Sequence, residues 1–592
     1  MNIHEKIITE IIAKSPKSKA KFDDARRQIA GGLKMKQPAN RDLLKAYQNL
    51  LKKKRVKQDK NIEKFLRKAD IRTLSGIAIV TSLIKPYACP GKCVYCPTEA
   101  RMPKSYLATE PAAARALGLK FNPYEQMQKR ILMLEGNGHP TDKIEYIIKG
   151  GTWNAYPLEY QYWFILESFR ACNELGKREI FPPPMRGRWP KAGGGLKKLQ
   201  EALEKEQKKN ETAKHRIIGL TLETRPDAIT PKTIYHMRQL GCTRIELGLQ
   251  APDDKILKLV KRGHTVQQFR DAMLLLRQAG FKVDLHFMPD LPGTTPKHDV
   301  AMYKKLFTDP GLKPDMVKIY PNTVIPSSEL YKWFKAGKYK PYDEKKLFDA
   351  LLRMKLATPR YCRISRLIRD IPDNEIAAGN RITNLREALT KELAKRGQKC
   401  VCLRCREIGR FVNTGLLRPD LVGTRNDNLK PKLFVEKYET IGGTEYFLTF
   451  EDKNRGAVYA FLRLRIPYKS TTPNPSFLRR GDESLPLGKG EMEGVEGQLY
   501  KLLPEIKDVA FVRELHTYGQ LVSLKHKNIK TLKQTNNEVQ HHGLGKKLLK
   551  EAEKIAKKNG FKKLAVISGI GVRDYYKKSG YLKKGRYMLK SI

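Results

Sequence analysis

Three cysteines near residue 90 are the residues of this 592-residue chain whose spacing points most directly to chemistry. Cys89, Cys93 and Cys96 follow the pattern C-x3-C-x2-C. Three thiolates on one short loop suit three irons of a 4Fe–4S cluster, which leaves the fourth iron open to a small molecule. A zinc site is the alternative, but it normally needs a fourth Cys or His close by. The neighbouring sequence offers none.

A second cysteine triplet, Cys400, Cys402 and Cys405, has the spacing C-x-C-x2-C and lies in a connecting segment. This pattern favours a structural zinc ion, and we expect Cys362 to be its fourth ligand. Three free thiols and a second redox cluster are the alternatives. A disulfide framework is not expected, because the nine cysteines are an odd number and the chain shows no secretion signal.

A glycine-rich segment, 540–546, reads Q-H-H-G-L-G-K and opens an amphipathic helical pattern over 544–557. Backbone N–H groups at such a helix start bind phosphate oxygens. A strand pattern precedes it, and another strand and the pair Tyr575-Tyr576 follow. This order resembles the GNAT acetyltransferases, in which the loop holds the pyrophosphate of coenzyme A. Each tyrosine would then act as an acid or position the acyl group; packing is the alternative role.

Small and polar residues also stand at the ends of predicted strands. One strand ends in Lys149-Gly150-Gly151-Thr152, and Glu223 and Gln250 end two others. Glycines let a ligand approach the backbone closely. In β/α barrels the carboxyl ends of the strands carry the active site, so we expect these residues to bind a cofactor there.

The elements that must position these residues follow from the alternation of short apolar runs with amphipathic stretches. This alternation predicts a parallel sheet or barrel. Its strand candidates are 76–80, 144–148, 217–222, 244–249, 282–288 and 315–319. From about residue 410 the pattern becomes β-rich, with strands at 445–450, 457–465, 509–515 and 563–568. Residues 181–214 are expected to be an insertion on a loop, and 467–497 a Pro/Gly-rich surface loop.

The predicted fold class is α/β, with a partial (β/α) barrel and an α+β domain of the GNAT type. We divide the chain into a basic helical region that contacts nucleic acid, the barrel, a connector with the zinc site, and the acetyltransferase domain. Their bounds are 1–70, 71–360, 361–409 and 410–592. The basic helices could equally be an ordinary solvated surface.

The charge of the chain suggests a polyanionic partner. Lys and Arg number 116 and Asp and Glu 62, so the formal net charge is 116 − 62 = +54. Nucleic acid is the commonest partner for such a field, and an acidic membrane surface is the alternative. The chain has no apolar run long enough to span a membrane and no signal peptide. We therefore expect a cytoplasmic protein with no membrane attachment.

The motifs together resemble one family. The cysteine loop with Tyr95 and the Gly-Gly-Thr strand end are similar to the radical S-adenosylmethionine (SAM) superfamily. The chain is further identified, over about 70–592, as a member of the family of Elongator catalytic subunits, the tRNA uridine acetyltransferases or carboxymethyluridine synthases. The segments that carry this resemblance are ELGLQ (246–250), RGHT (262–265), KIYP (318–321), RLIRDIP (366–372), VRELHTYG (512–519) and VISGIGVRDYYKKSGY (566–581).

The resemblance implies a role for each candidate residue. The first cysteine triplet would hold the cluster, and Gly150, Gly151, Thr152, Glu223 and Gln250 would hold SAM. Lys143 would contact acetyl-CoA, and Tyr576 would close the coenzyme A site. The catalytic candidates are Lys143, His516, Tyr575 and Tyr576. The other expected coenzyme A contacts are Glu514, Leu515, His516, Thr517, Gln540, Gly543, Leu544, Gly545 and Lys546.

The implied reaction places a carboxymethyl group on carbon-5 of the wobble uridine of tRNA. A SAM-derived radical would abstract hydrogen from the methyl group of acetyl-CoA, the carbon radical would add to the base, and hydrolysis would cleave the thioester. The implied partners are tRNA, acetyl-CoA and SAM, with Elongator-like subunits or self-association. Two other classes are a protein lysine acetyltransferase, with His516 or a Glu as base, and a tRNA-binding scaffold with a structural cluster.

Overall fold

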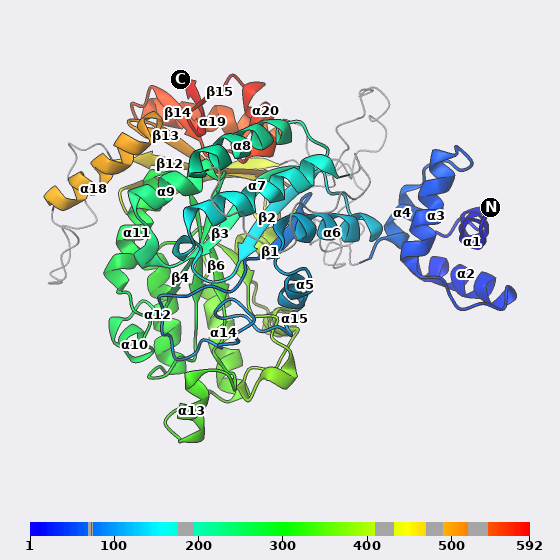
Figure 1. The fold of residues 1–592 in the computed structure, drawn as a ribbon, viewed down its shortest axis with the longest axis horizontal. Helices are drawn as coiled ribbons and strands as arrows, with labels where there is room; N and C mark the ends of the chain where they lie inside the picture. Colours follow the sequence, from blue (N-terminus) through cyan, green and yellow to red (C-terminus); the bar gives the residue numbers. More distant parts are fainter. Residues whose placement is uncertain (69–72, 74, 176–194, 409–430, 469–488, 519–542) are drawn as a thin grey trace.

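The computed structural model describes residues 1–68, 73, 75–175, 195–408, 431–468, 489–518 and 543–592. Four helices come first and form a unit with its own apolar core. This unit stands to one side of the body, beside α6 (Figure 1). Its helices are α1 (Ile3–Ala13), α2 (Lys19–Gly32), α3 (Asn40–Lys52) and α4 (Lys60–Leu66). The expectation of helices in this region is confirmed.

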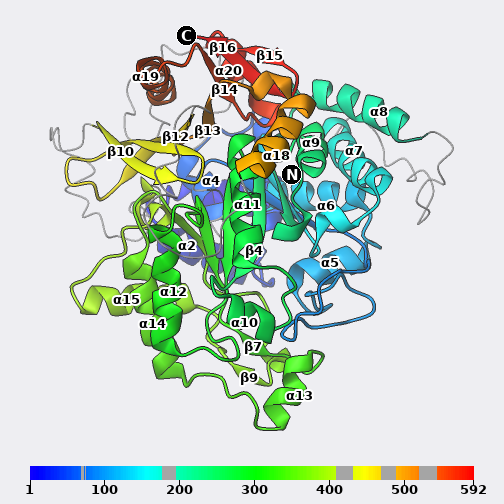
Figure 2. The same ribbon diagram turned by 90° about the vertical axis from the view of Figure 1, so that its left-hand side faces the viewer.

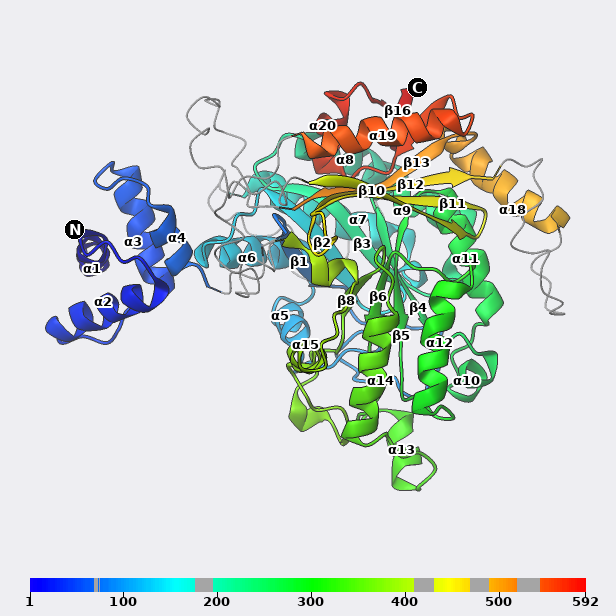
Figure 3. The same ribbon diagram turned by 180° about the vertical axis from the view of Figure 1, so that it is seen from behind.

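The body is built around a parallel seven-stranded sheet in the order β1-β2-β3-β4-β5-β6-β8. Its strands are β1 (Ala78–Leu83), β2 (Lys143–Lys149), β3 (Arg216–Thr224), β4 (Arg244–Gln250), β5 (Lys282–Phe287), β6 (Met316–Ile319) and β8 (Arg363–Arg366). Helices connect successive strands and cover the outside, as parallel pairing requires (Figure 3). In the described residues β1 and β8 are the two edges, so the sheet is a partial barrel, as expected.

The helices of this part are α5 (Pro111–Gly118), α6 (Pro123–Gly136), α7 (Leu158–Glu174), α8 (Gly195–Asn210), α9 (Pro231–Gln239), α10 (Asp254–Leu259), α11 (Val266–Gln278), α12 (Pro296–Thr308), α13 (Glu329–Lys335), α14 (Glu344–Ala357) and α15 (Leu385–Lys395). The short strands β7 (Thr323–Val324) and β9 (Ala378–Gly379) pair with each other. The six predicted strands are confirmed. The seventh, β8, extends the sheet beyond residue 360, where we expected the connector to begin; at four residues it is too short for a periodicity signal.

A second, mixed sheet has the order β10-β11-β12-β13-β14-β16-β15. Its strands are β10 (Lys432–Thr440), β11 (Gly443–Glu451), β12 (Val458–Pro467), β13 (Ala510–Thr517), β14 (Lys563–Val566), β15 (Leu582–Lys584) and β16 (Tyr587–Ser591). With α18 (Lys489–Leu502), α19 (Leu544–Lys558) and α20 (Arg573–Lys577) it forms the C-terminal α+β domain. This domain lies across one end of the partial barrel (Figure 3).

Two expected loops contain regular structure. In the segment 181–214, residues 195–210 form α8, which packs on α7 (Figure 2). In the segment 467–497, residues from 489 onwards belong to α18, which packs against α9 (Figure 2). Residues 181–194 and 469–488 lie outside the described part. The loop interpretation gave too much weight to the adjacent Pro and Gly residues, because tertiary contacts outweigh the weak propensities of a single segment.

The C-terminal domain covers the end of the barrel where the parallel strands begin. The buried Arg513 of β13 donates hydrogen bonds to Phe281 O (2.7 Å) and to Asp315 Oδ2 (2.8 Å), which directly precede β5 and β6. The loop at Gly569 lies against β3, where an added Cβ would stand 1.9 Å from Ile218 O. The cysteine loop follows the carboxyl end of β1 at the opposite end.

Candidate functional site

One cavity of about 1810 Å³ connects the two ends of the partial barrel. It is lined by alternate residues of the strands, for example Glu246, Gly248 and Gln250 on β4. Side chains two residues apart point to the same face of a strand, so this face is the interior of the barrel. The lining reaches from Cys93 at one end to His516 and Tyr575 of the C-terminal domain at the other.

The cysteine loop forms one end of this cavity, at the carboxyl ends of the barrel strands, with all three thiols in its wall. Cys93 is buried, and Cys89 Sγ lies 3.7 Å from Thr152 Oγ1. The backbone N–H of Gly91 points at Cys89 Sγ over 3.4 Å. A hydrogen bond from Cys96 and the charge of Arg262 lower the pKa of the Cys93 thiol to about 4 against the effect of burial. A thiolate is the form that binds iron.

The residues around this loop fit a cluster and a carboxylate-bearing ligand such as SAM. Gly91 leaves room for the guanidinium of Arg225, because a Cβ there would lie 2.3 Å from Arg225 Nη1. Asp227 binds Nε and Nη2 of Arg225 at 2.9 and 3.0 Å, whereas the buried Nη1 has no hydrogen-bond partner among the described residues. Gln250 Oε1 is likewise buried without one. Buried polar atoms normally have a hydrogen-bond partner, so these two atoms are available to bind a ligand.

The first triplet does not converge on a single point. Among the described residues, two groups of three His, Cys, Asp or Glu side chains bring their ligand atoms within 4.8 Å of one another, and the first triplet is not one of them. Cys93 and Cys96 hydrogen-bond to each other, so Cys89 is the member that lies farther away.

A charged cluster occupies the middle of the cavity. Lys149 and Lys318 both donate to Glu246 Oε2, and His286 Nε2 lies 3.4 Å from the same oxygen. Glu223 accepts from Tyr106 OH at 2.8 Å. Burial would raise the pKa of Glu223, but Lys149, His286 and Lys318 hold it at about 2. Glu223, Glu246 and His286 form the compact group of the barrel interior, yet Lys149 and Lys318 already contact Glu246 Oε2, which disfavours a metal cation there.

Sequence reasoning missed Glu246 and Lys318 as site residues. The signal was present in the strands themselves, where charged residues recur at every second position (Arg244 and Glu246; Lys282, Asp284 and His286). A buried parallel strand normally reads as a continuous apolar run. Charges with a period of two therefore indicate that one face of the strand lines a polar cavity.

The other end of the cavity, in the C-terminal domain, lies where β13 and β14 separate. Their parallel pairing covers only Ala510–Val512, and β13 continues to Thr517 paired with β12 alone. Gly543, at φ 91°, precedes α19, and an added Cβ on Gly545 would lie 2.6 Å from the Tyr575 hydroxyl. The open strand edge and the helix start offer backbone N–H groups to phosphate and amide groups of a ligand.

The titratable groups at this end are held in defined states. Burial would raise the pKa of Glu514, but Lys282 and Arg463 lower it to about 2. Burial lowers the pKa of His516 and of Lys143, and it raises the pKa of Tyr575 and Tyr576. His516 and both phenols are therefore uncharged near neutral pH.

Most of the expected site residues meet at this one cavity. Those that line it are Cys89, Cys93, Cys96, Lys143, Gly151, Thr152, Glu223, Gln250, Glu514, Leu515, His516, Thr517, Gly543, Gly545, Lys546, Tyr575 and Tyr576. Gly150 and Leu544 do not line it: Gly150 packs against Ile84, and Leu544 belongs to the apolar core under α19. Gln540 lies outside the described residues.

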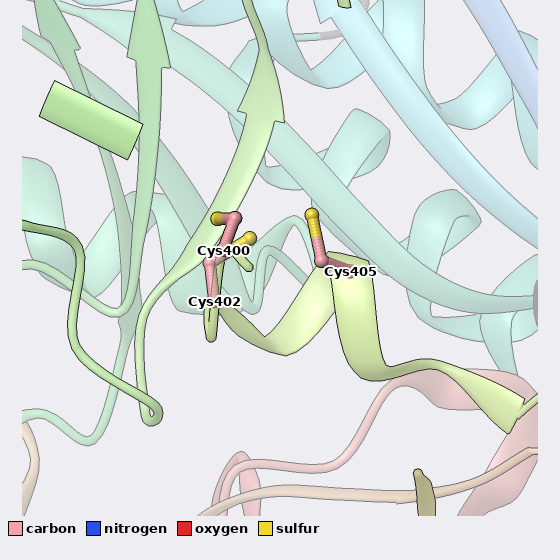
Figure 4. A group of neighbouring side chains, drawn as sticks. All are labelled: Cys400, Cys402 and Cys405. Carbon is pink, nitrogen blue, oxygen red and sulfur yellow. The ribbon is translucent and has the colours of Figure 1, made fainter. Parts of the chain in front are cut away.

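The second cysteine triplet is a separate group. Cys400, Cys402 and Cys405 bring their sulfurs within 4.8 Å of one another (Figure 4). Cys405 comes from the short helix η5 (Leu403–Arg406). The expected fourth ligand, Cys362, is buried nearby, and its carbonyl oxygen accepts from Leu403 N at 2.9 Å. Its sulfur does not belong to the group within 4.8 Å.

Comparisons with known proteins place these features in a family. Residues 189–306 match the radical SAM superfamily and 314–395 the radical SAM C-terminal domain. The radical SAM fold implies a 4Fe–4S cluster and SAM. Within the described residues, no helix is long and apolar enough to cross a membrane.

Similar proteins match nearly the whole chain. The tRNA uridine(34) acetyltransferase of Methanocaldococcus infernus is 41% identical, over 92% of this chain and 91% of its own. Elongator complex protein 3 of Schizosaccharomyces pombe is 33% identical, over 89% of this chain and 86% of its own. The solved structure of M. infernus Elp3 with residues 1–46 deleted superimposes with a TM-score of 0.67 at 39% identity, covering 88% of this chain and 100% of that one. The chain therefore belongs to the family of the tRNA uridine(34) acetyltransferases and Elongator complex protein 3, within the radical SAM superfamily.

Proposed function

We propose that this chain is a tRNA-modifying enzyme that uses acetyl-CoA and a SAM-derived radical to install a carboxymethyl group on carbon-5 of the wobble uridine. The observation that carries the proposal is the single cavity, which joins the cysteine loop to the separated strands β13 and β14. An enzyme that only transferred an acetyl group to an amine would have no use for this connection.

At the cysteine-loop end of the cavity, Cys89, Cys93 and Cys96 would hold the cluster. When bound there, the cluster supplies one electron to SAM and so a radical able to abstract hydrogen. The unpartnered Arg225 Nη1 suits the carboxylate of SAM. Gly151 and Thr152 follow β2 in the cavity wall beside the cysteine loop. They would leave room for the amino group of SAM. Gly150 would give Ile84 the space that a side chain would fill.

At the end of the cavity in the C-terminal domain, the separated strands and the start of α19 would hold coenzyme A. Lys143, the first residue of β2, lines the cavity between this end and the charged cluster. It is therefore placed to contact the acetyl-bearing arm inside the barrel. His516, uncharged and buried with Nε2 unpartnered among the described residues, can accept a proton from water during thioester hydrolysis.

The acceptor would be a base from a loop of RNA. Unpaired bases of a loop can be turned out of the stack and enclosed. Lys and Arg side chains of the surface would bind phosphates and set the position of the loop without reading its sequence. The net charge of +54 supports this assignment.

The connector triplet would bind a structural zinc ion. Three sulfurs within 4.8 Å of one another support a single tetrahedral ion rather than a cluster. Cys362 stays the proposed fourth ligand, although its sulfur would have to move closer to the other three to bind the same ion. The metal content of wild type and of C402S, measured after anaerobic purification, tests the zinc assignment.

The function is tested by incubating anaerobically reconstituted protein with tRNA, SAM, acetyl-CoA and a reductant, followed by nucleoside analysis. We expect 5-carboxymethyluridine, and its absence with a fully loaded cluster would refute the proposal. A lysine-containing peptide in place of tRNA tests the alternative of a protein acetyltransferase. Acetylation of the peptide by Cys93→Ser as fast as by wild type would support that alternative.

A further inference from the structure

Arg262 lies buried in the cavity wall against the cysteine loop, and no role has been assigned to it above. It follows α10, at the start of the segment 262–265. Its Nη1 donates to Cys93 Sγ over 3.5 Å, its Nη2 donates to Gly248 O at 2.7 Å, and its Nε donates to His264 Nε2 at 3.0 Å. Each of the three nitrogens of the guanidinium group therefore has its own hydrogen-bond acceptor.

The surroundings fix this orientation. A Cβ on Gly248 would lie 2.6 Å from Arg262 Nη2, so a larger residue at this position would displace the guanidinium group. Burial and the charge of Arg262 lower the pKa of His264 to about 4. His264 is therefore neutral; its Nδ1 lies 3.2 Å from Thr265 O, and its Nε2 lies 3.1 Å from Gly248 O as well as 3.0 Å from Arg262 Nε. In the tautomer that carries the proton on Nδ1, Nε2 accepts from Arg262. The loop itself is joined to the cysteine loop, because Val94 N donates to Val260 O at 3.1 Å.

The charge of Arg262 has no carboxylate beside it. Among the described residues Arg262 takes part in no ion pair within 4.0 Å, although many other buried arginines of this chain do, for example Arg277 and Arg513 with Glu445. Burying an uncompensated charge is costly. The arrangement is favourable when Cys93 is a thiolate that belongs to an anionic group.

We propose that Arg262 is a positioning residue that raises the reduction potential of the iron–sulfur cluster held by Cys89, Cys93 and Cys96. A cation and an N–H donor directed at a ligand sulfur stabilise the reduced, more negative cluster over the oxidised one. His264 and Gly248 act through Arg262 by holding it in place. The inference needs the cluster of the proposed function but not its tRNA or acetyl-CoA chemistry.

The test is a potentiometric titration of the reconstituted cluster, followed by electron paramagnetic resonance without acetyl-CoA or tRNA. In Arg262→Gln we expect the equilibrium constant for one-electron reduction to fall at least about tenfold, which corresponds to a potential about 59 mV lower. Arg262→Met should behave in the same way. Lys261→Gln is the matched control, because it removes the same charge at the exposed neighbouring residue, which pairs with Glu329 at 2.5 Å; its potential should equal that of wild type.

Each result of the titration either supports or overturns the proposed effect of Arg262 on the reduction potential. A wild-type potential in a fully loaded R262Q or R262M would overturn the inference. So would a folded R262Q and R262M that bind no iron, because Arg262 would then be needed to hold the cluster rather than to set its potential. An equal fall in K261Q would show that the effect is a general one of net charge. Failure of carboxymethyluridine formation in wild type would overturn the proposed function and leave this measurement unaffected.

Discussion

Single residues decide what each end of the cavity can hold. Cys93 is the most buried of the three cysteines of the first loop, and it is the one that Arg262 contacts. At the other end, Gly545 leaves room for the Tyr575 hydroxyl, which crosses the start of α19. These are local effects of size and charge, and they are best tested by exchanging one side chain.

Replacing Cys93 with serine should abolish modification while tRNA binding survives. A serine hydroxyl is a poor ligand for iron, so we expect the yield of 5-carboxymethyluridine to fall by about a hundredfold or more. Filter binding measures the affinity for tRNA in parallel. Cys172→Ala, which removes a buried thiol of α7 outside the cavity wall, serves as control. A C93S protein with undiminished activity would favour the scaffold alternative.

A second prediction at this scale concerns Asp290, which is buried and lies at φ 66° in the turn after β5. Burial raises the pKa of its carboxyl to about 8, and Asp299 adds to the effect. Below pH 4 both the folded and the unfolded state hold this proton. Between pH 4 and 8 only the folded state holds it, so stability falls as the pH rises through this window.

Asp290→Asn removes this penalty and keeps a side chain that tolerates a positive φ. The free energy of unfolding of D290N, relative to wild type, should therefore rise by about 3–4 kcal/mol between pH 5 and pH 8. Urea titrations at the two pH values measure the difference. A constant difference would show that Asp290 ionises in the folded protein as it does in the unfolded chain.

At the scale of elements, a buried ionic network joins the barrel to the C-terminal domain. Four arginines, Arg277, Arg463, Arg465 and Arg513, surround Asp315 and Glu445, and all six side chains are buried. Arg513 is the bulged residue of β13, between the paired residues Val512 and Glu514. The network therefore fixes the strand that carries Glu514 and His516 against the start of β5 and β6.

The helix α8 provides a second connection between the two domains. At its end, Glu211 pairs with Arg573 at 3.1 Å and with Lys577 at 2.7 Å, and both partners lie on α20. Glu204 of α8 pairs with Arg586 at 3.1 Å. Half of the expected loop insertion is thus a helix between the barrel and the C-terminal domain.

Asp315→Asn should weaken the connection between the domains. The change leaves buried guanidinium groups without their counter-charge, which costs about 3–5 kcal/mol. We expect a lower urea midpoint and cleavage of the C-terminal domain by protease at lower urea concentrations. The control is Asp309→Asn, whose carboxylate pairs with Arg270 at 2.8 Å near the surface, where a pair contributes about 1 kcal/mol or less. Equal midpoints for D315N and D309N would contradict a structural role of the network.

At the scale of the whole molecule, the excess positive charge lies outside the cavity in which the reaction is proposed to take place. The net charge is +54, whereas the charged groups in the middle of the cavity largely neutralise one another. The four N-terminal helices pack around their own core beside the body and form a separate surface (Figure 1). We assign this surface and the rim of the barrel to phosphate contacts. Partner subunits or self-association stay a prediction.

Binding of tRNA should weaken steeply as salt concentration rises. Each phosphate neutralised by Lys or Arg releases bound counterions, so the logarithm of the affinity falls linearly with the logarithm of the salt concentration. Between 50 and 200 mM salt we expect a loss of about a thousandfold if about six phosphates are contacted. Fluorescence anisotropy with labelled tRNA measures it, with the affinity for acetyl-CoA as the comparison. A salt-independent affinity for tRNA would separate the net charge from RNA binding.

The sequence by itself determined the type of chemistry and the order of the parts. Cysteine spacing, strand alternation and the glycine-rich helix start are local features, so they predicted the cysteine loop, six of the seven barrel strands, and α19. The four-residue β8, the helices α8 and α18, and the charged middle layer were missed, because they depend on contacts between distant segments.

Only the tertiary structure decided that the two candidate sites share one cavity. A period of two shows that the strands have a polar face, but the curvature of the sheet decides whether that face encloses a space. In the same way, the segment RGHT contains Arg262 and His264, but it does not predict that the guanidinium of Arg262 contacts Cys93, which lies 169 residues earlier in the chain. Such pairings arise from the packing of loops at the carboxyl ends of the strands, and no local pattern encodes them.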